Sequence, residues 1–148
     1  MKEKQFVNDY LSSDHRRLDL LFESLIHGIQ EGKPLENQQS LFHLYKTGML
    51  RHMHWEENIL FPIVDDVVGL RSGPTRVLRA EHAELESMIR DIEKNMEEGF
   101  DLDYLLALGH IVDRHHESEE KTLYPVVDDL SRGDIQERIA IEISRGFK

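Results

Sequence analysis

The sequence of 148 residues contains no cysteine. Disulfide bonds, thiolate nucleophiles, zinc fingers and iron–sulfur clusters held by thiolates are therefore all excluded. If the protein binds a metal ion, the ligands must be nitrogen and oxygen atoms, which histidine and carboxylate side chains supply.

Positive charge is scarce as well, with 18 lysine and arginine residues against 29 acidic ones and a formal net charge of −11. A charge of this sign repels phosphate backbones and anionic lipid headgroups, so neither nucleic acid nor a membrane is an expected partner. No apolar run approaches the roughly 18 residues of a membrane span, and the first residues lack the hydrophobic region of a signal peptide. We therefore expect a cytoplasmic protein with a single domain over residues 1–148.

Four stretches carry apolar residues at three- and four-residue intervals, which is typical of amphipathic helices. They run from about residue 3 to 30, 36 to 61, 74 to 98 and 101 to 124. Because no stretch alternates at period two and the connections are short, the predicted fold is all-α, an up-down-up-down four-helix bundle. Pro62 is expected either to kink or to close the second helix, because proline removes an amide donor, and Leu44 is expected on the inner face of that helix.

The bundle is expected to occupy residues 3–130, followed by a short C-terminal helix. Four apolar residues recur there at four-residue spacing over about residues 133–147, namely Ile135, Ile139, Ile143 and Phe147. Such an amphipathic helix could cap the bundle or pair with a second copy of the chain in a homodimer.

Two stretches, residues 52–62 and 115–125, share the pattern H-x-x-x-E-E-x-x-L-[FY]-P. Positions i and i+4 of a helix face the same way, so His52 with Glu56 and His115 with Glu119 each place an imidazole and a carboxylate one turn apart. Each stretch therefore supplies half of a metal site.

A second repeat adds one lone histidine to each of the other two helices. Asp14-His15-x-x-Leu18 in the first helix matches Glu81-His82-x-x-Leu85 in the third. All six polar candidates lie on the predicted inner faces, where an uncompensated imidazole or carboxylate costs several kcal/mol of desolvation. Metal ions would compensate them; the alternative is that the six side chains pair with one another and bind no metal.

The donor set indicates which metal is expected. Two carboxylates on opposing helices can each bridge two cations, and four imidazoles then supply two terminal nitrogens to each. This nitrogen and oxygen coordination suits iron or manganese better than structural zinc, which prefers closed tetrahedral sites. Ferritin-like bundles use Glu-x-x-His and additional glutamates, so the order found here argues against a ferritin.

At these residues the sequence resembles the hemerythrin-like (HHE cation-binding) domain family, in its type with four histidines and two glutamates, up to about Leu130. The resemblance implies a hemerythrin-like bundle around two iron ions with an oxo or hydroxo bridge, in whose place manganese or zinc could bind. It implies terminal ligands at His15, His52, His82 and His115 and bridging ligands at Glu56 and Glu119. By analogy with the oxygen carriers, His15 and His52 would share one iron, and His82 and His115 the other.

The sequence departs from the oxygen-carrying hemerythrins at two positions. Glu86 stands where they carry a fifth histidine, and Glu119 lies four residues after the last histidine where they have an aspartate at five. Glu86 and Asp19 each follow a lone histidine by four residues, so each is a candidate for an additional ligand or for a hydrogen-bond partner of a ligand. His54 and His116 are expected to point away from the shared face, on the surface or behind a ligand.

The ligand set looks more like the di-iron proteins associated with repair of iron centres under nitrosative and oxidative stress. Those proteins commonly carry a cysteine-bearing N-terminal domain, which this sequence lacks. The resemblance therefore implies a non-haem di-iron protein that binds O2, NO or H2O2 in stress response, sensing or iron-centre repair. Reversible O2 binding or storage and iron storage or delivery are alternatives, and the sequence leaves open whether the protein is an enzyme and which residues would be catalytic.

Overall fold

The structure, a computed structural model, describes residues 6–68, 74–130 and 141. Their helices are α1 (Phe6–Gln30), α2 (Leu35–Trp55), η1 (Glu56–Leu60), α3 (Phe61–Val68), α4 (Pro74–Asn95), η2 (Met96–Glu98), α5 (Leu102–Ser118), η3 (Glu119–Leu123) and α6 (Tyr124–Leu130). No strand occurs in these ranges. The predicted C-terminal helix at 133–147 lies outside the described residues, Ile141 excepted.

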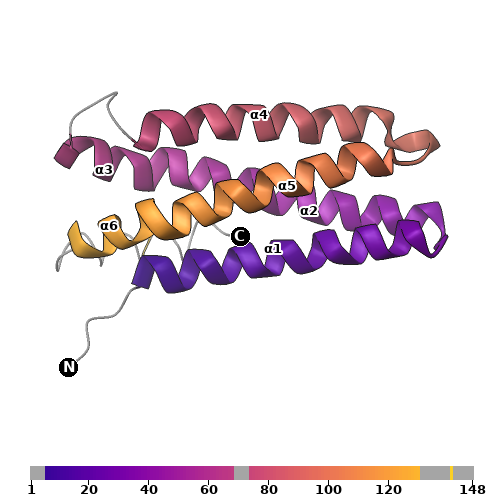
Figure 1. Ribbon diagram of the computed structural model, residues 1–148, viewed down its shortest axis with the longest axis horizontal. Helices are drawn as coiled ribbons and strands as arrows, with labels where there is room; N and C mark the ends of the chain where they lie inside the picture. Colours follow the sequence, from indigo (N-terminus) through magenta and orange to yellow (C-terminus); the bar gives the residue numbers. More distant parts are fainter. Residues whose placement is uncertain (1–5, 69–73, 131–140, 142–148) are drawn as a thin grey trace.

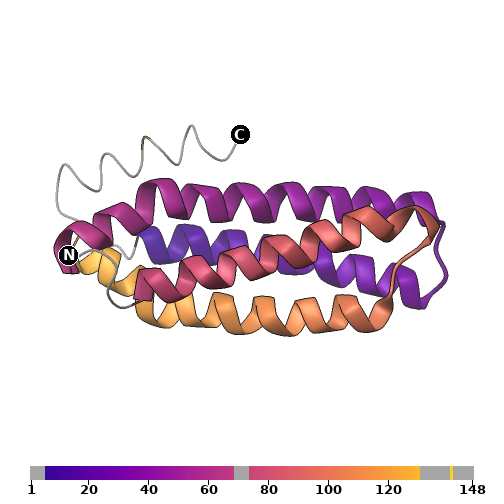
Figure 2. The ribbon, with the colours of Figure 1, turned by 90° about the horizontal axis from the view of Figure 1, so that it is seen from above.

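Four long rods make up the fold. Helix α2 continues through η1 into α3, α5 continues through η3 into α6, and α1 and α4 form the other two rods (Figure 1). A view from above shows the rods side by side along their length, with successive rods running in opposite directions (Figure 2). The predicted up-down-up-down four-helix bundle is confirmed. None of the described helices is long and apolar enough to cross a membrane.

Local sequence signals account for the chain reversals at the end of the bundle opposite Pro62 and Pro125. Gly32 has a φ of +67° and follows α1, and the Lys33 amide donates to the Gly28 carbonyl at 2.9 Å, the bond that closes a Schellman motif. At the start of α5 the Asp101 side chain accepts from the Tyr104 amide at 3.3 Å and so caps the helix.

Of the two alternatives for Pro62, closure of the second helix is wrong, because the helical rod continues past the proline to Val68. The turn before the proline widens into a π-helix, in which the Phe61 amide donates to the Glu56 carbonyl five residues back. The same widening precedes Pro125, where the Tyr124 amide donates to the Glu119 carbonyl. A π-turn inserts one extra residue into the helix, which allows the chain to pass a proline and remain helical.

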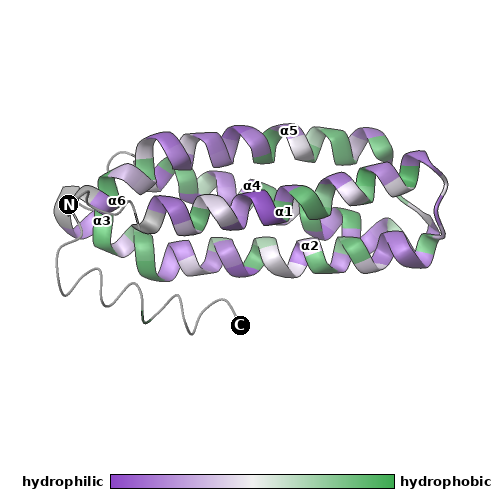
Figure 3. Cartoon of the chain, turned by 90° about the horizontal axis from the view of Figure 1, so that it is seen from below, coloured by the Kyte–Doolittle hydropathy of each residue, from purple (hydrophilic) through white to green (hydrophobic). Residues whose placement is uncertain are grey.

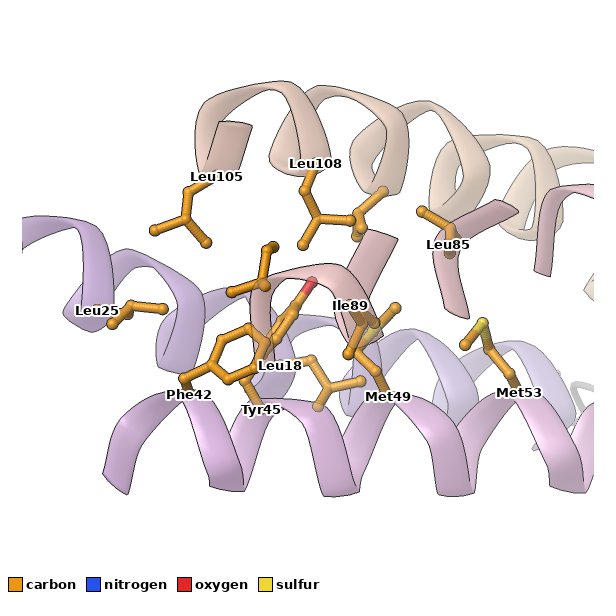
Figure 4. Packing of buried hydrophobic residues seen from close by; sticks show 12 residues of the cluster. Leu18, Leu25, Phe42, Tyr45, Met49, Met53, Leu85, Ile89, Leu105 and Leu108 are labelled. Carbon is orange, nitrogen blue, oxygen red and sulfur yellow. The ribbon is translucent and has the colours of Figure 1, made fainter. Parts of the chain in front are cut away.

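Hydrophobic and hydrophilic residues alternate in bands along each rod (Figure 3), and the buried residues of the rods are mainly apolar. One core cluster lies around α3 and α6, and its fully buried members include Leu11, Leu60, Phe61, Tyr124 and Val127. The other fills the opposite part of the bundle, where Leu18, Phe42, Tyr45, Met49, Leu85 and Leu105 meet from all four rods (Figure 4). The prediction for Leu44 is wrong: its side chain is 55% exposed, since the buried stripe of α2 runs through Phe42, Tyr45 and Met49.

Helices α1 and α2 pack closely against each other at Gly48. A Cβ atom added there would lie 2.6 Å from Leu18 Cδ2, a side chain that is itself fully buried. At Gly28, near the end of α1, an added Cβ would meet only the Lys33 side chain, at 3.6 Å.

We therefore expect Gly48→Ala and Gly28→Ala to change the free energy of unfolding in different ways. Both gain helix propensity, but overpacking at Gly48 should leave Gly48→Ala less stable than Gly28→Ala by about 1–3 kcal/mol. Urea unfolding followed by circular dichroism measures the difference. Equal stability of the two variants would show that the α1–α2 approach tolerates a methyl group.

Candidate metal centre

The six polar residues predicted from the sequence converge inside the bundle. Their ligand atoms form two overlapping groups, each with all atoms within 4.8 Å of one another. The first group is His15, His52, Glu56 and Glu119; the second is Glu56, His82, His115 and Glu119. The two glutamates belong to both groups, and the histidines fall into the same two pairs that the family resemblance implies.

The cluster lies as a polar layer between the two apolar clusters of the core. On α1, His15 stands between Leu11 of one apolar cluster and Leu18 of the other, and on α4, His82 stands between Leu78 and Leu85. None of the six side chains is more than 2% exposed, and both glutamates are completely buried. Water therefore does not solvate these carboxylates, so the cluster itself or a bound cation must supply their compensating charge.

In the first group the imidazole Nε2 atoms point to a common centre. His15 Nε2 and His52 Nε2 lie 3.1 Å apart, His15 Nε2 lies 3.2 Å from Glu119 Oε1, and His52 Nε2 lies 3.4 Å from Glu56 Oε2. Two unprotonated Nε2 atoms at this separation would repel each other through their lone pairs. A proton on one of them, or a cation against both, has to lie between them.

The second group repeats this arrangement with the other oxygen of each glutamate. His82 Nε2 lies 3.2 Å from Glu56 Oε1 and 3.3 Å from Glu119 Oε2, and His115 Nε2 lies 3.1 Å from Glu119 Oε2. Each glutamate thus directs one oxygen to each group, which is the geometry of a carboxylate that bridges two cations.

Two atoms of this group make no hydrogen bond to any described residue although they are buried. They are Glu56 Oε1 and His115 Nε2, whose nearest partners lie within ion-pair distance but outside hydrogen-bond geometry. Unsatisfied buried acceptors are costly, and a cation bound between them would satisfy both. The residues present therefore fit a pair of metal ions.

A carboxylate holds the outer nitrogen of each of the four imidazoles. The Nδ1 atoms donate at 2.7–2.8 Å to four acids: His15 to Glu120, His52 to Asp14, His82 to Glu57 and His115 to Glu81. These bonds place the proton on Nδ1, leave Nε2 free as a ligand and fix the ring orientation. Sequence reasoning missed this role, although the signal is there: the acid before each lone histidine and the second glutamate of each Glu-Glu pair recur in the repeat.

The electrostatics of the cluster favour positive charge. Burial lowers the pKa of His52, but Glu56 and the hydrogen bond to Asp14 outweigh burial and raise it to about 10. Burial likewise lowers the pKa of His82, and its bonds to Glu119, Glu56 and Glu57 raise it to about 11. Burial raises the pKa of Glu119, yet the charge of His115 holds it well below the ordinary value of a glutamate. Without metal, protons on the imidazoles neutralise the glutamates; bound cations would take their place.

Tyr124 is a member of the cluster that helical periodicity did not predict. Its hydroxyl donates to Glu56 Oε2 at 2.6 Å and lies 3.1 Å from Glu119 Oε1, 3.0 Å from His15 Nε2 and 3.2 Å from His52 Nε2. In a regular α-helix, a residue five positions after Glu119 would point about 140° away from it. The π-helix η3 lies between the two residues and brings Tyr124 back to the inner face.

The two remaining histidines of the motifs lie in different surroundings. His54 is exposed and contacts Glu86, whereas His116 is buried and stacks on the ring of His15, with centroids 3.5 Å apart and planes 8° from parallel. Burial and the charge of His15 lower the pKa of His116 well below its ordinary value, so the ring is neutral. It packs behind a cluster residue without joining the cluster.

Glu86 and Asp19 do not join the groups of converging atoms. Glu86 contacts His54 Nε2 and Arg90 Nε, both at 3.2 Å, on a partly exposed face of α4. Asp19 is 42% exposed, and its nearest ion-pair partner is His116 Nδ1 at 3.9 Å. Both acids follow a histidine by four residues, as Glu56 and Glu119 do, but His54 and Arg90 hold the Glu86 carboxylate outside the cluster, and the Asp19 side chain is largely exposed.

The fold and this donor set agree with comparisons to known proteins. The chain belongs to the hemerythrin HHE cation-binding domain family, whose sequence profile matches residues 7–127, and it therefore carries a metal-binding site of histidine and glutamate residues. A DNA nickase from Nostoc sp. (strain PCC 7120 / SAG 25.82 / UTEX 2576) is 26% identical over 142 residues, which are 95% of this chain and 39% of the nickase. The chain thus spans less than half the length of that relative. No solved structure matches the chain.

Replacing one outer carboxylate tests the orientation of the imidazoles. Glu81 contacts His115 Nδ1 at 2.7 Å and takes no part in the converging groups, so Glu81→Gln should lower metal affinity by about 10–100-fold while the six inner side chains stay in place. Competition with a chelator of known affinity measures the change. The control is Glu117→Gln, an exposed glutamate paired with Lys121; affinities that match between the two variants would contradict the orienting role.

Proposed function

We propose that this protein is a cytoplasmic non-haem di-iron protein that binds a small ligand, O2, NO or H2O2, in oxidative or nitrosative stress response, sensing or iron-centre repair. His15, His52, His82 and His115 act as terminal ligands, and Glu56 and Glu119 bridge the two ions. One observation carries the proposal: Glu56 and Glu119 each direct one carboxylate oxygen to the first pair of histidines and the other oxygen to the second pair.

The balance of charge supports two cations of high charge. Six carboxylates surround the four imidazoles: the inner Glu56 and Glu119, and the outer Asp14, Glu57, Glu81 and Glu120. Hydrogen bonds from His82 and His15 hold the pKa of Glu57 and Glu120 below the ordinary value of a glutamate. Two divalent or trivalent ions would neutralise the two buried glutamates and part of the charge of the outer acids without any proton on the imidazoles.

The donor types support iron. Each position offers two imidazole nitrogens and two carboxylate oxygens without a thiolate, a set suited to iron or manganese and able to take a further ligand. When bound, iron supplies reversible oxidation and reduction and an affinity for O2, NO and peroxide. The chain's own residues orient the imidazoles through the outer carboxylates and keep bulk water out with the apolar clusters on either side of the polar layer.

Anaerobic loading with ferrous iron tests the proposal directly. Elemental analysis should find two irons per chain, and the visible spectrum should change on addition of O2, NO or H2O2. A spectrum that returns when O2 is removed would favour reversible O2 binding, whereas continuous consumption of peroxide or NO would favour chemistry in stress response. Retention of fewer than two irons, or of zinc in preference to iron, would contradict a di-iron centre.

The ligand roles predict the behaviour of single variants. Glu119→Ala and His52→Ala should each lose iron, and each should lower the free energy of unfolding by about 3–5 kcal/mol, because buried charged partners are left unpaired. His54→Gln, which removes an exposed imidazole outside the cluster, serves as the control and should keep the iron and its visible absorption. Two irons per chain in either alanine variant, measured by elemental analysis, would refute the assignment.

A further inference from the structure

The two halves of the cluster, which the internal repeat relates, differ at one buried aromatic residue. The first half contains the Tyr124 hydroxyl, and the equivalent residue of the other repeat is Phe61. Both rings pack alike against a lone histidine: the Tyr124 ring centroid lies 5.5 Å from that of His15, and the Phe61 ring centroid lies 5.3 Å from that of His82. The repeat therefore places the same ring in both halves and an oxygen atom in only one.

The position of the Tyr124 oxygen matches that of a ligand. It lies 2.6–3.2 Å from all four donor atoms of the first half, which belong to His15, His52, Glu56 and Glu119. Ligand atoms ~2.1 Å from one cation and at right angles to each other are about 3.0 Å apart. Three distances between the four donor atoms are 3.1–3.4 Å, and the Tyr124 oxygen lies close to all four atoms. The five atoms therefore have the spacing of five ligands around one cation.

The second half has no corresponding oxygen among the residues that the structure describes. Its donors are His82, His115 and one oxygen each from Glu56 and Glu119, and the Phe61 ring, which takes the place of Tyr124 in the repeat, carries no oxygen atom. A surface hollow of about 350 Å³ borders one donor residue of this half, His82, and is lined also by Glu57, Ala83 and Glu86. The Arg79 guanidinium also lines the hollow and lies over the Phe61 ring, 5.1 Å from its centroid, which places a positive charge near the entrance.

We propose that Tyr124 is the fifth protein ligand of the cation between His15 and His52, so that a small anionic or diatomic ligand binds the other cation, between His82 and His115, through this hollow. The inference rests on the proposed function, because it requires two bound irons. On coordination the phenol O–H bond breaks, the oxygen binds the metal as a phenolate and the proton passes to solvent; no electron is transferred. A cation bound at that oxygen stabilises the deprotonated form.

The pair Tyr124→Phe and Phe61→Tyr tests the assignment with matched changes. The diferric protein should show a phenolate-to-iron charge-transfer band and tyrosine ring modes in resonance Raman spectra, and Tyr124→Phe should lose both while keeping two irons. Azide, the probe for the open position, should bind once per chain in the natural sequence and twice in Tyr124→Phe. In Phe61→Tyr the new hydroxyl should occupy the open position and weaken azide binding by roughly tenfold or more.

Entry through the hollow has its own control. Ala83 of α4 lines the hollow, whereas Ala80 of the same helix is exposed and does not line it. Replacing either alanine with leucine adds the same side chain to α4, but only leucine at position 83 would narrow the hollow. Ala83→Leu should slow azide association in stopped-flow measurements, and Ala80→Leu should leave it unchanged. Equal rates in both variants would overturn the route.

The two proposals fail in distinguishable ways. Fewer than two irons per chain in the natural sequence would refute the di-iron centre. Two irons per chain without a phenolate band in the natural sequence would refute the role of Tyr124 and leave the di-iron centre standing. The same conclusion would follow if the band and the azide stoichiometry were unchanged in Tyr124→Phe. Should Tyr124→Phe fail to fold, ring-deuterated tyrosine in the natural sequence decides the matter, because its resonance Raman modes shift only if a tyrosine binds iron.

Discussion

The complete burial of two carboxylates in an otherwise apolar bundle is the constraint on which the rest of this structure depends. Glu56 and Glu119 have no access to solvent, and an isolated ionised carboxylate in such surroundings is strongly unfavourable. Everything around them supplies positive charge or hydrogen-bond donors: four imidazoles from four rods and one phenol hydroxyl. The bundle therefore folds around a charge requirement that protons satisfy in the absence of metal and that two cations would satisfy in their presence.

The same requirement ties the helices together. Each outer carboxylate reaches an imidazole on a different rod: Asp14 of α1 holds His52 of α2, Glu57 of η1 holds His82 of α4, and Glu81 of α4 holds His115 of α5. These bonds fix the relative rotation of neighbouring rods at the level of the cluster. Apolar packing above and below then needs only to fill space, which residues of suitable volume can do in several combinations.

The π-turns connect the backbone to the chemistry of the cluster. Each begins at a completely buried glutamate and ends just before the aromatic residue of the Leu-[FY]-Pro pattern. The inserted residue allows the helix to pass the proline and also turns the aromatic ring inward. Because one repeat carries tyrosine and the other phenylalanine at this place, two nearly symmetric halves acquire different inner surfaces from a single oxygen atom.

The sequence by itself determined the helices, their antiparallel order and the six side chains that meet in the core, because amphipathic spacing and i, i+4 geometry are local properties of a helix. The same spacing rule failed for Glu86, whose carboxylate His54 and Arg90 hold outside the cluster. It also failed for Tyr124, because a π-turn changes the direction of every residue after it and 3.6-residue periodicity does not foresee it. Which acid holds which imidazole, and which half of the cluster receives a hydroxyl, were decided only by the tertiary structure, since those contacts join rods whose relative rotation the packing of the whole bundle sets.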